Sequence, residues 1–138
     1  MPPKFCFQLL AGTARVAKCL LKKGLLTFPI GICIDPWQNV LDVHVEHILL
    51  HWIQGGHIRF LWVGIPCTSF TRARKYDGVG PGAIRSEHHV CGLPILNCAD
   101  KKKVRGGNAL LQVSLRLLSA CEQLGVPYAL ENPASSFI

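Results

Sequence analysis

The stretch Phe60-Leu61-Trp62-Val63-Gly64-Ile65-Pro66-Cys67 decides the fold class of this 138-residue chain. Residues 60–65 form an unbroken apolar run of strand length, which is typical of a central parallel strand buried on both faces of a sheet. The run stops at a proline, and a cysteine follows it. A strand of this kind indicates a sheet with helices on its faces.

Strands and helices alternate on both sides of this run. The apolar spacing predicts a strand over residues 5–10 and a helix from 16 to 21, then a strand over 30–34 and a helix from 45 to 53. A helix over 110–124 and a strand over 127–130 follow further along the chain. This alternation predicts an α/β fold with a Rossmann-like, mostly parallel sheet and helices on both faces.

Composition and charge point to one folded domain over residues 1–138 with a basic middle region. Hydrophobic residues make up 49% of the chain, charged residues 17%, and the formal net charge is +7. Residues 59–105 contain nine Lys or Arg and three Asp or Glu, so this segment carries most of the net positive charge of the chain. Within it, residues 68–107 are rich in Gly, Pro and basic residues, and we expect a long basic loop there, either functional or partly disordered. The charge favours a polyanionic partner such as nucleic acid.

Two classes of protein are disfavoured. The longest apolar stretch, residues 24–34, holds 11 residues and includes Pro29, whereas a membrane helix needs roughly 18 to 20. We therefore expect an intracellular protein, nuclear or cytoplasmic, with no membrane partner. The seven cysteines are odd in number and form no Cys-x-x-Cys pair, which argues against a disulfide framework or a zinc ribbon. Most of them are interpreted as small core residues.

Polar and small residues follow each predicted strand. In parallel α/β sheets, ligands bind beyond the carboxyl ends of the strands. The residues at those ends are Ala11-Gly12-Thr13, Asp35-Pro36, Pro66-Cys67 and Glu131-Asn132. The sequence therefore predicts that a glycine turn, two acids and a cysteine converge on one edge of the sheet.

Three of these residues suggest specific chemistry, each with a simpler alternative. Gly12 allows a ligand to approach the backbone at a helix N-terminus. Asp35, which lies 23 positions later, has the spacing of an acid that accepts hydrogen bonds from a ribose, although it could merely begin a turn. Cys67 differs from the other six cysteines in its place at the rim, where nearby basic residues favour a reactive thiolate. Its alternative is a buried, inert cysteine.

Two histidine-containing groups and one lysine run carry weaker signals. His44, His47 and His51 share a helix face, which we interpret as solvated. The group His88, His89, Cys91 and Cys98 could hold zinc, but its spacing matches no common closed site, so no metal is predicted. The run Lys101-Lys102-Lys103 with Arg105 is either a solvated face or a surface that follows phosphates.

Three motifs, in order along the chain, resemble DNA cytosine-5 methyltransferases. Residues 63–71, Val-Gly-Ile-Pro-Cys-Thr-Ser-Phe-Thr, are similar to the family signature Gly-Gly-Pro-Pro-Cys-Gln-Gly-Phe-Ser. Residues 8–13, Gln-Leu-Leu-Ala-Gly-Thr, resemble the opening Asp-Leu-Phe-Ala-Gly motif, and Glu131-Asn132 resembles the Glu-Asn-Val motif. The resemblance implies a domain that binds S-adenosylmethionine and methylates a base in nucleic acid, with DNA favoured over RNA.

The resemblance also implies roles for individual residues. Cys67 is expected to add to carbon 6 of cytosine, while Glu131, with Asn132 beside it, holds the ring at nitrogen 3 and activates carbon 5. The base must leave its stack to reach them. The expected cofactor residues are Leu10, Ala11, Gly12, Thr13, Asp35, Pro36, Asp42 and Pro66, of which Asp42 would lie beside the adenine. The expected nucleic-acid contacts are Ser69, Arg72, Arg74, Lys75 and Arg85.

The chain also departs from the family pattern. Gln8 replaces the first acid, Ala14 and Arg15 replace a Gly-Gly pair, and Pro133 replaces Val. The sequence ends at Ile138, soon after the Glu-Asn motif, so the resemblance covers only the front part of the catalytic domain and implies an incomplete methyltransferase fold. We expect a fragment or a shortened relative, with a further domain or chain completing the fold. The alternative function is a non-catalytic, basic nucleic-acid-binding relic, for example from a mobile element.

Overall fold

The computed structural model describes residues 3–72, 74 and 79–138. They fall into two compact units. The first comprises residues 1–64 and 112–131 and is called the sheet unit; the second comprises residues 65–111 and 132–138 and is called the loop unit. Each unit is described by itself.

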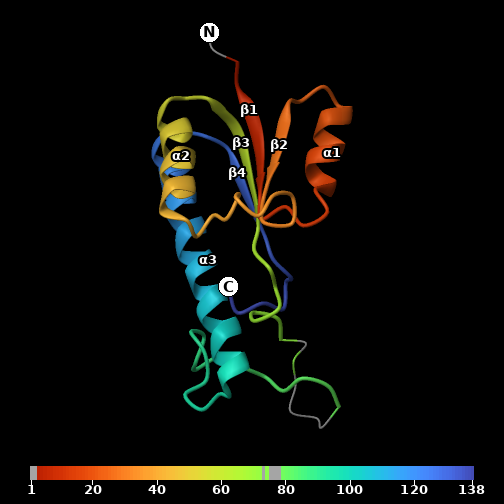
Figure 1. The fold of residues 1–138 in the computed structure, drawn as a ribbon, viewed down its shortest axis with the longest axis vertical. Helices are drawn as coiled ribbons and strands as arrows, with labels where there is room; N and C mark the ends of the chain where they lie inside the picture. Colours follow the sequence, from red (N-terminus) through yellow and green to blue (C-terminus); the bar gives the residue numbers. More distant parts are fainter. Residues whose placement is uncertain (1–2, 73, 75–78) are drawn as a thin grey trace. The chain divides into compact units, whose positions relative to one another are not determined.

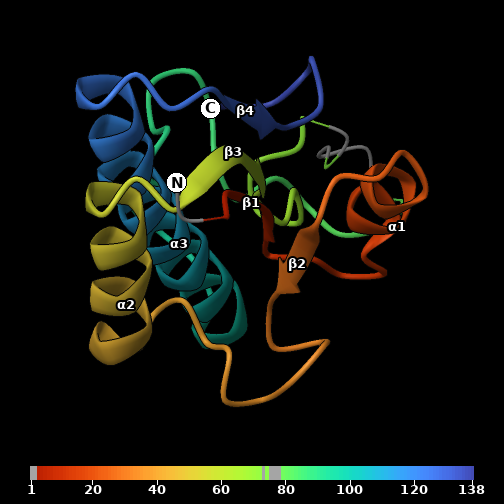
Figure 2. The same cartoon turned by 90° about the horizontal axis from the view of Figure 1, so that it is seen from above.

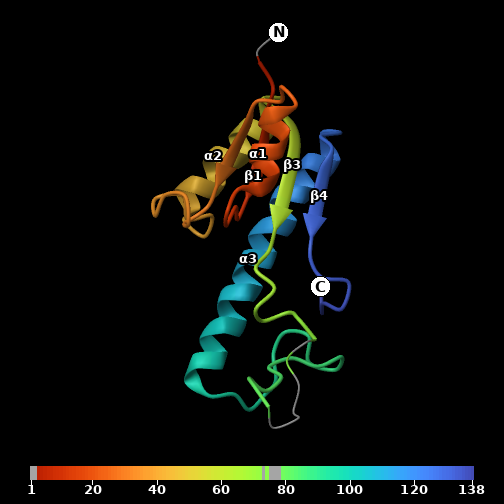
Figure 3. The same cartoon turned by 90° about the vertical axis from the view of Figure 1, so that its right-hand side faces the viewer.

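The sheet unit contains a parallel sheet of four strands (Figures 1 and 3). The strands are β1 (Phe5–Leu9), β2 (Thr27–Ile30), β3 (Ile58–Gly64) and β4 (Tyr128–Glu131). Their order is β2-β1-β3-β4, and every neighbouring pair is parallel. β3 is a central strand, as predicted, but it is fully buried on one face only: Leu61 and Val63 are completely buried, whereas Phe60 and Trp62, on the other face, are half-buried.

Helices cover both faces of this sheet. The helices are α1 (Arg15–Lys22), α2 (Val43–Gln54) and α3 (Cys98–Gln123), of which α3 begins in the loop unit and ends in the sheet unit. Figure 2 shows α1 on one face of the sheet, with α2 and the last turns of α3 on the other. The prediction of an α/β fold with a parallel sheet is confirmed, and the arrangement is consistent with a Rossmann-like fold.

The second strand lies earlier than the sequence pattern predicted. β2 covers residues 27–30, whereas the strand was expected over 30–34. Cys6 of β1 pairs with Thr27, which sets this register. The β-branched residues between 30 and 34 do not form the expected strand, because Gly31 interrupts them and Ile32, beyond the glycine, is 63% exposed. Burial against the neighbouring strand, rather than β-branching, decides the register.

The expected loop over 68–107 is also shorter than predicted, because α3 already begins at Cys98. The side-chain oxygen of Asn97 accepts a hydrogen bond of 2.8 Å from the backbone N–H of Asp100, as an N-cap residue does. Val104, six residues after the first residue of the helix, is buried. The helix therefore begins with a cap at Asn97 and a buried contact at Val104. Apolar periodicity did not predict this start, because the segment is basic.

Gln8 supplies the cap that the start of α1 lacks. The N-cap residue of α1, Ala14, has no side chain that can accept a hydrogen bond. Instead, the Gln8 side-chain oxygen accepts a 2.7 Å hydrogen bond from the N–H of Ala17. The departure from the family pattern at Gln8 thus has a structural use: it holds α1 on β1.

Removing this cap is expected to destabilise the sheet unit. Because an N-cap side chain contributes about 0.5 to 2 kcal/mol, Gln8→Ala should lower the free energy of unfolding by that amount. Gln112→Ala, at an exposed position of α3, is the matched control and should be neutral or slightly stabilising. Urea denaturation followed by tryptophan fluorescence measures both, since all three tryptophans lie in the sheet unit. Equal effects of the two substitutions would contradict the capping role.

A bidentate ion pair joins α2 to α3. Arg116 Nε lies 2.6 Å from Glu46 Oε1, and Arg116 Nη2 lies 3.0 Å from Glu46 Oε2. The hydrogen bond from Arg116 lowers the pKa of Glu46 below its ordinary value of 4.5. A lowered carboxylate pKa stabilises the folded state above the ordinary value, and this contribution disappears as the pH falls through the folded-state pKa.

The pair is therefore expected to contribute to stability at neutral pH and not in acid. The Arg116 side chain is 54% exposed, so solvent screening keeps the contribution of the pair small. A double-mutant cycle with Glu46→Gln and Arg116→Gln, measured by denaturation at pH 7 and at pH 3, should give a coupling energy only at the higher pH. A coupling energy of the same size at both pH values would contradict this assignment.

Candidate functional site

The carboxyl ends of all four strands of the sheet unit lie at one edge of the sheet, because the strands are parallel. β1 lies between β2 and β3, so the chain leaves β1 toward one side of the sheet and the later strands are added on the other. In α/β sheets, ligands bind outside the carboxyl ends of the strands at such a reversal, which here lies between β1 and β3.

The turn between β1 and α1 has an unusual backbone. Leu10 has a φ of 57° and Ala14 a φ of 53°, both in the left-handed region that residues other than glycine seldom adopt. Between them, Ala11 is buried, while Gly12 and Thr13 are exposed. A Cβ atom at Gly12 would meet no atom within 4 Å, so its backbone is open to an approaching group. Backbone strain of this kind clusters at functional sites.

The segment after β2 supports this turn. A Cβ atom on Gly31 would lie 3.0 Å from the backbone nitrogen of Ala11, so only glycine fits without displacement. The N–H of Ala11 donates to the carbonyl of Ile30 at 3.1 Å, and the N–H of Gly31 donates to the Gln38 side chain at 3.2 Å. The two loops at the ends of β1 and β2 therefore hold each other in place.

Asp35 and Asp42 each use one carboxylate oxygen within their own loop. Asp35 Oδ1 accepts a 3.0 Å hydrogen bond from the N–H of Trp37, so the acid does form the turn that was its simpler interpretation. Asp42 Oδ1 accepts a 2.8 Å hydrogen bond from the N–H of His44 and is the N-cap of α2. Within the part of the chain that the structure describes, the second oxygen of each carboxylate has no partner, so both can still accept a bond from a ligand. Pro36 is exposed beside Asp35.

Trp37 is a candidate that the sequence reasoning missed. Its side chain is 88% exposed, although tryptophan is among the most buried residues on average. It lies two residues after Asp35, in the segment that follows β2. An exposed indole there can stack on a planar ligand group. An aromatic residue beside a candidate acid was the signal that could have identified it.

Glu131 is the last residue of β4 and pairs in register with Gly64 at the end of β3. Its Oε2 accepts a 3.2 Å hydrogen bond from the indole N–H of Trp62. A Cβ atom on Gly64 would lie 3.6 Å from the same oxygen, so the carboxylate leans across the end of the neighbouring strand. The side chain is exposed and can reach a ligand at this edge.

In the loop unit, Cys67 begins a tight turn. Its carbonyl accepts hydrogen bonds from the N–H groups of Phe70 and Thr71, at 3.0 and 2.9 Å. Phe70 is buried and anchors the turn, while Pro66 and the Cys67 side chain are exposed. Cys67 is therefore not buried, contrary to its simpler interpretation.

The expectation that Cys67 differs from every other cysteine in its place is also wrong. All seven cysteines are free, and only Cys6 and Cys121 are buried; burial raises the pKa of the Cys121 thiol to about 11. Cys19, Cys33, Cys91 and Cys98 are exposed like Cys67. Most of the cysteines are thus not core residues, because they lie outside the strand and helix faces that form the core.

Two residues expected to contact nucleic acid are instead buried in the loop unit. Arg85 is 2% exposed and Ser69 is 4% exposed. The guanidinium donates to the Ser69 carbonyl at 2.9 Å, to the Asn108 side chain at 2.8 Å and to the carbonyls of Val90 and Val104, and it lies 4.0 Å from the centre of the Phe70 ring. Burial lowers the pKa of Arg85. We correct the assignment: these residues hold the Cys67 turn against α3 and do not contact phosphates.

The remaining predicted contacts are partly used within the loop unit. Arg72 pairs with Glu87 at 2.8 Å, and the Arg74 side chain, 11% exposed, pairs with Asp100 at 3.3 Å. Lys75 lies outside the described residues. Lys101, Lys102 and Arg105 of α3 are exposed, and none of them pairs with an acid among the residues that the structure describes. Among the described residues of the loop unit, these three are the exposed cations that form no ion pair.

Asn132 carries an unexplained polar group. Both side-chain atoms of this residue, Nδ2 and Oδ1, are buried and have no hydrogen-bond partner within the described residues. Buried amides are nearly always hydrogen-bonded, so an unsatisfied one needs an explanation. A ligand that offers one donor and one acceptor would provide it.

Among the described residues, no three His, Cys, Asp or Glu side chains are grouped to hold a metal ion, and no helix has the length and apolarity to cross a bilayer. No protein-family model, curated protein or solved structure matches the chain.

Proposed function

We propose that this chain is an S-adenosylmethionine-dependent domain of the cytosine-5 methyltransferase type that acts on a base in nucleic acid. The observation that carries the proposal is the turn over residues 10–14, whose backbone is strained at Leu10 and Ala14 and open at Gly12. This turn follows β1 at the same edge of the sheet as Glu131, the last residue of β4. The three sequence motifs agree with this placement.

The residues of this edge fit the cofactor. The open backbone at Gly12 admits a charged ligand group, and the second oxygen of Asp35 can accept hydrogen bonds from ribose hydroxyls. Trp37 offers an exposed ring to the adenine, and Asp42 follows in the same loop. Leu10, Ala11, Thr13 and Pro36, of the loops after β1 and β2, would lie beside the cofactor. When bound, the cofactor supplies an electrophilic methyl group on a sulfonium.

Cys67 and Glu131 have different roles toward the base. The Cys67 thiolate adds to carbon 6 of cytosine, Glu131 holds nitrogen 3 of the ring, and the unsatisfied amide of Asn132 accepts and donates to the ring edge. Cys67 lies three residues beyond Gly64, the register partner of Glu131, so the chain limits the Cα–Cα distance between Gly64 and Cys67 to about 11 Å.

Calorimetric titration with S-adenosylmethionine tests the cofactor half of the proposal. We expect saturable one-to-one binding, and Gly12→Val should weaken it at least tenfold, because the added methyl groups would occupy the open space over the turn. Gly12 does not need a positive φ, so the variant should keep its melting temperature. Unchanged affinity in Gly12→Val, or no binding by the native chain, would contradict the proposed cofactor site.

One observation favours a second candidate, a non-catalytic module that binds nucleic acid. Lys101, Lys102 and Arg105 form an exposed basic face on α3. Such a face binds phosphates without reading sequence, and the affinity falls steeply with salt. This candidate predicts salt-dependent binding that is unchanged by S-adenosylmethionine and by Cys67→Ser, whereas the first candidate predicts that both matter.

A further inference from the structure

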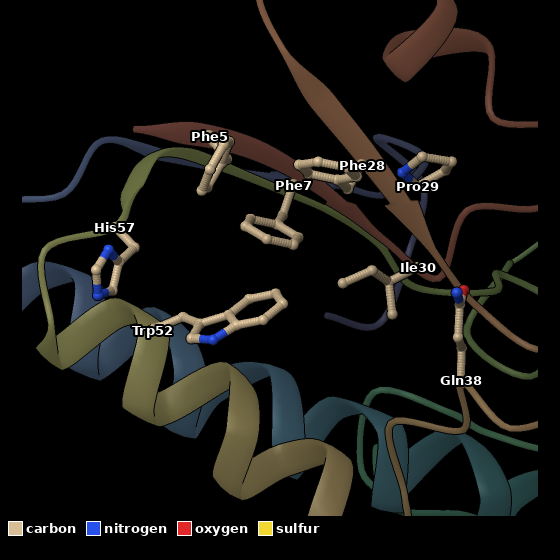
Figure 4. Close-up of a pocket in the computed structure, with 8 residues that line it drawn as sticks. All are labelled: Phe5, Phe7, Phe28, Pro29, Ile30, Gln38, Trp52 and His57. Carbon is tan, nitrogen blue, oxygen red and sulfur yellow. The ribbon is translucent and has the colours of Figure 1, made fainter. Parts of the chain in front are cut away.

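We propose that an apolar cavity in the sheet unit binds a small, uncharged aromatic molecule. The cavity has a volume of about 410 Å³ and lies between β1 and β2 of the sheet and helix α2 (Figure 4). It is separate from the residues to which the proposed methyl transfer is assigned. Small-molecule sites in proteins span roughly 300 to 1,000 Å³, so the space is sufficient.

The lining is mainly aromatic. Phe5 and Phe7 of β1, Phe28 of β2 and Trp52 of α2 surround the space, with Pro29 and Ile30 completing the wall along β2. The Phe7 ring is 5.3 Å from the Trp52 ring and 5.7 Å from the Phe28 ring, measured between centroids. At such distances aromatic rings interact favourably, and a further planar ring can join the cluster edge-on or stacked.

The absence of charge selects an uncharged ligand. The described residues that line the cavity include no Asp, Glu, Lys or Arg, so an ion would lose its hydration without gaining a counter-charge. Gln38 and His57 are the two strongly polar side chains of the lining and, in Figure 4, lie at opposite ends of the space. Gln38 uses its oxygen to hold Gly31, which leaves its NH₂ group as a donor. The ligand is thus apolar in its middle, with a hydrogen-bonding atom near an end.

The cavity is open to an incoming molecule. Phe28 is 42% exposed and Trp52 is 38% exposed, so two large rings remain in contact with water. Covering them would bury apolar surface, which is favourable by about 25 cal/mol per Å². Pairing of a second chain along the β2 edge is disfavoured, because Pro29 has no N–H to donate. A small molecule is therefore the occupant that the lining suits.

Fluorescence titration with N-phenyl-1-naphthylamine, an uncharged aromatic amine, tests this proposal. The full chain should bind the probe saturably at one site, with enhanced probe emission. Ile30→Trp, which fills the cavity, should weaken binding at least tenfold. Ile95→Trp, at a 91% exposed position outside the cavity, is the matched control and should leave the affinity unchanged.

Several results would overturn the proposal. These are binding that does not saturate, equal affinity in Ile30→Trp and the native chain, or probe binding that decreases as sedimentation shows the chain dimerising over this face. Should Ile30→Trp fail to fold, Phe28→Ala removes a half-exposed ring of the lining and should likewise weaken binding at least tenfold. A folded Phe28→Ala variant with native affinity would also refute the site.

Discussion

Gly107→Ala is expected to destabilise the loop unit by about 1 to 3 kcal/mol, because the position has no room for a methyl group. A Cβ atom there would overlap Ser69 Oγ and would lie 3.1 Å from the Phe70 ring and 3.2 Å from Arg85 Nη2. These three groups form the buried cluster that holds the turn beginning at Cys67. The close approach of α3 to this turn therefore depends on a glycine.

The neighbouring glycine provides the control. Gly106 lies in the same helix, yet a Cβ atom on it would meet nothing within 4 Å. Since alanine favours a helix over glycine by about 1 kcal/mol, Gly106→Ala should stabilise the loop unit. Hydrogen exchange of the amides between Ile84 and Asn108 reports on this unit, where no tryptophan is present. Faster exchange in Gly107→Ala and slower exchange in Gly106→Ala is the expected result; equal exchange in both would show that Gly107 has no packing role.

The parallel sheet could be predicted because the apolar run over residues 60–65 has the length of a strand, and β3, with its fully buried Leu61 and Val63, confirmed it. The apolar run over residues 30–34 was a weaker guide, because only Ile30 of it lies in a strand. β2 was misplaced because its register depends on which residues pair with β1 and on the tight contact of Gly31 with Ala11. Neither contact leaves a signal in the local sequence.

The basic segment shows a second limit of sequence reasoning. A count of charges cannot distinguish an arginine that contacts a partner from one that holds the fold. Arg85 is surrounded by carbonyls of its own unit and by the Phe70 ring, whereas Lys101 and Arg105, in the same segment, are exposed. Only the packing of the chain separates these two uses of positive charge.

Cys67→Ser is expected to abolish a covalent complex with nucleic acid that the native chain forms. In the proposed reaction the thiolate adds to carbon 6 of cytosine, and carbon 5 then takes the methyl group. The proton on carbon 5 must afterwards leave before the cysteine can be released. Fluorine at carbon 5 cannot leave as a proton would, so the bond between sulfur and carbon persists. Serine is a far weaker nucleophile than a thiolate and should form no such bond.

The matched control is Cys91→Ser. Cys91 is a free, exposed cysteine of the same unit, so the substitution changes one accessible sulfur just as Cys67→Ser does. Its complex with the fluorinated base should form as in the native chain. A loss in both variants would indicate general damage to the loop unit rather than a nucleophile at Cys67.

The nucleophilic role of Cys67 is tested by the mass of the chain after incubation with S-adenosylmethionine and an oligonucleotide containing 5-fluorocytosine, as DNA and as RNA. The mass of the native chain and of Cys91→Ser should increase by one oligonucleotide plus one methyl group, and that of Cys67→Ser should not change. No covalent complex with either nucleic acid, in a chain that binds the cofactor, would contradict this role. So would a complex that survives in Cys67→Ser.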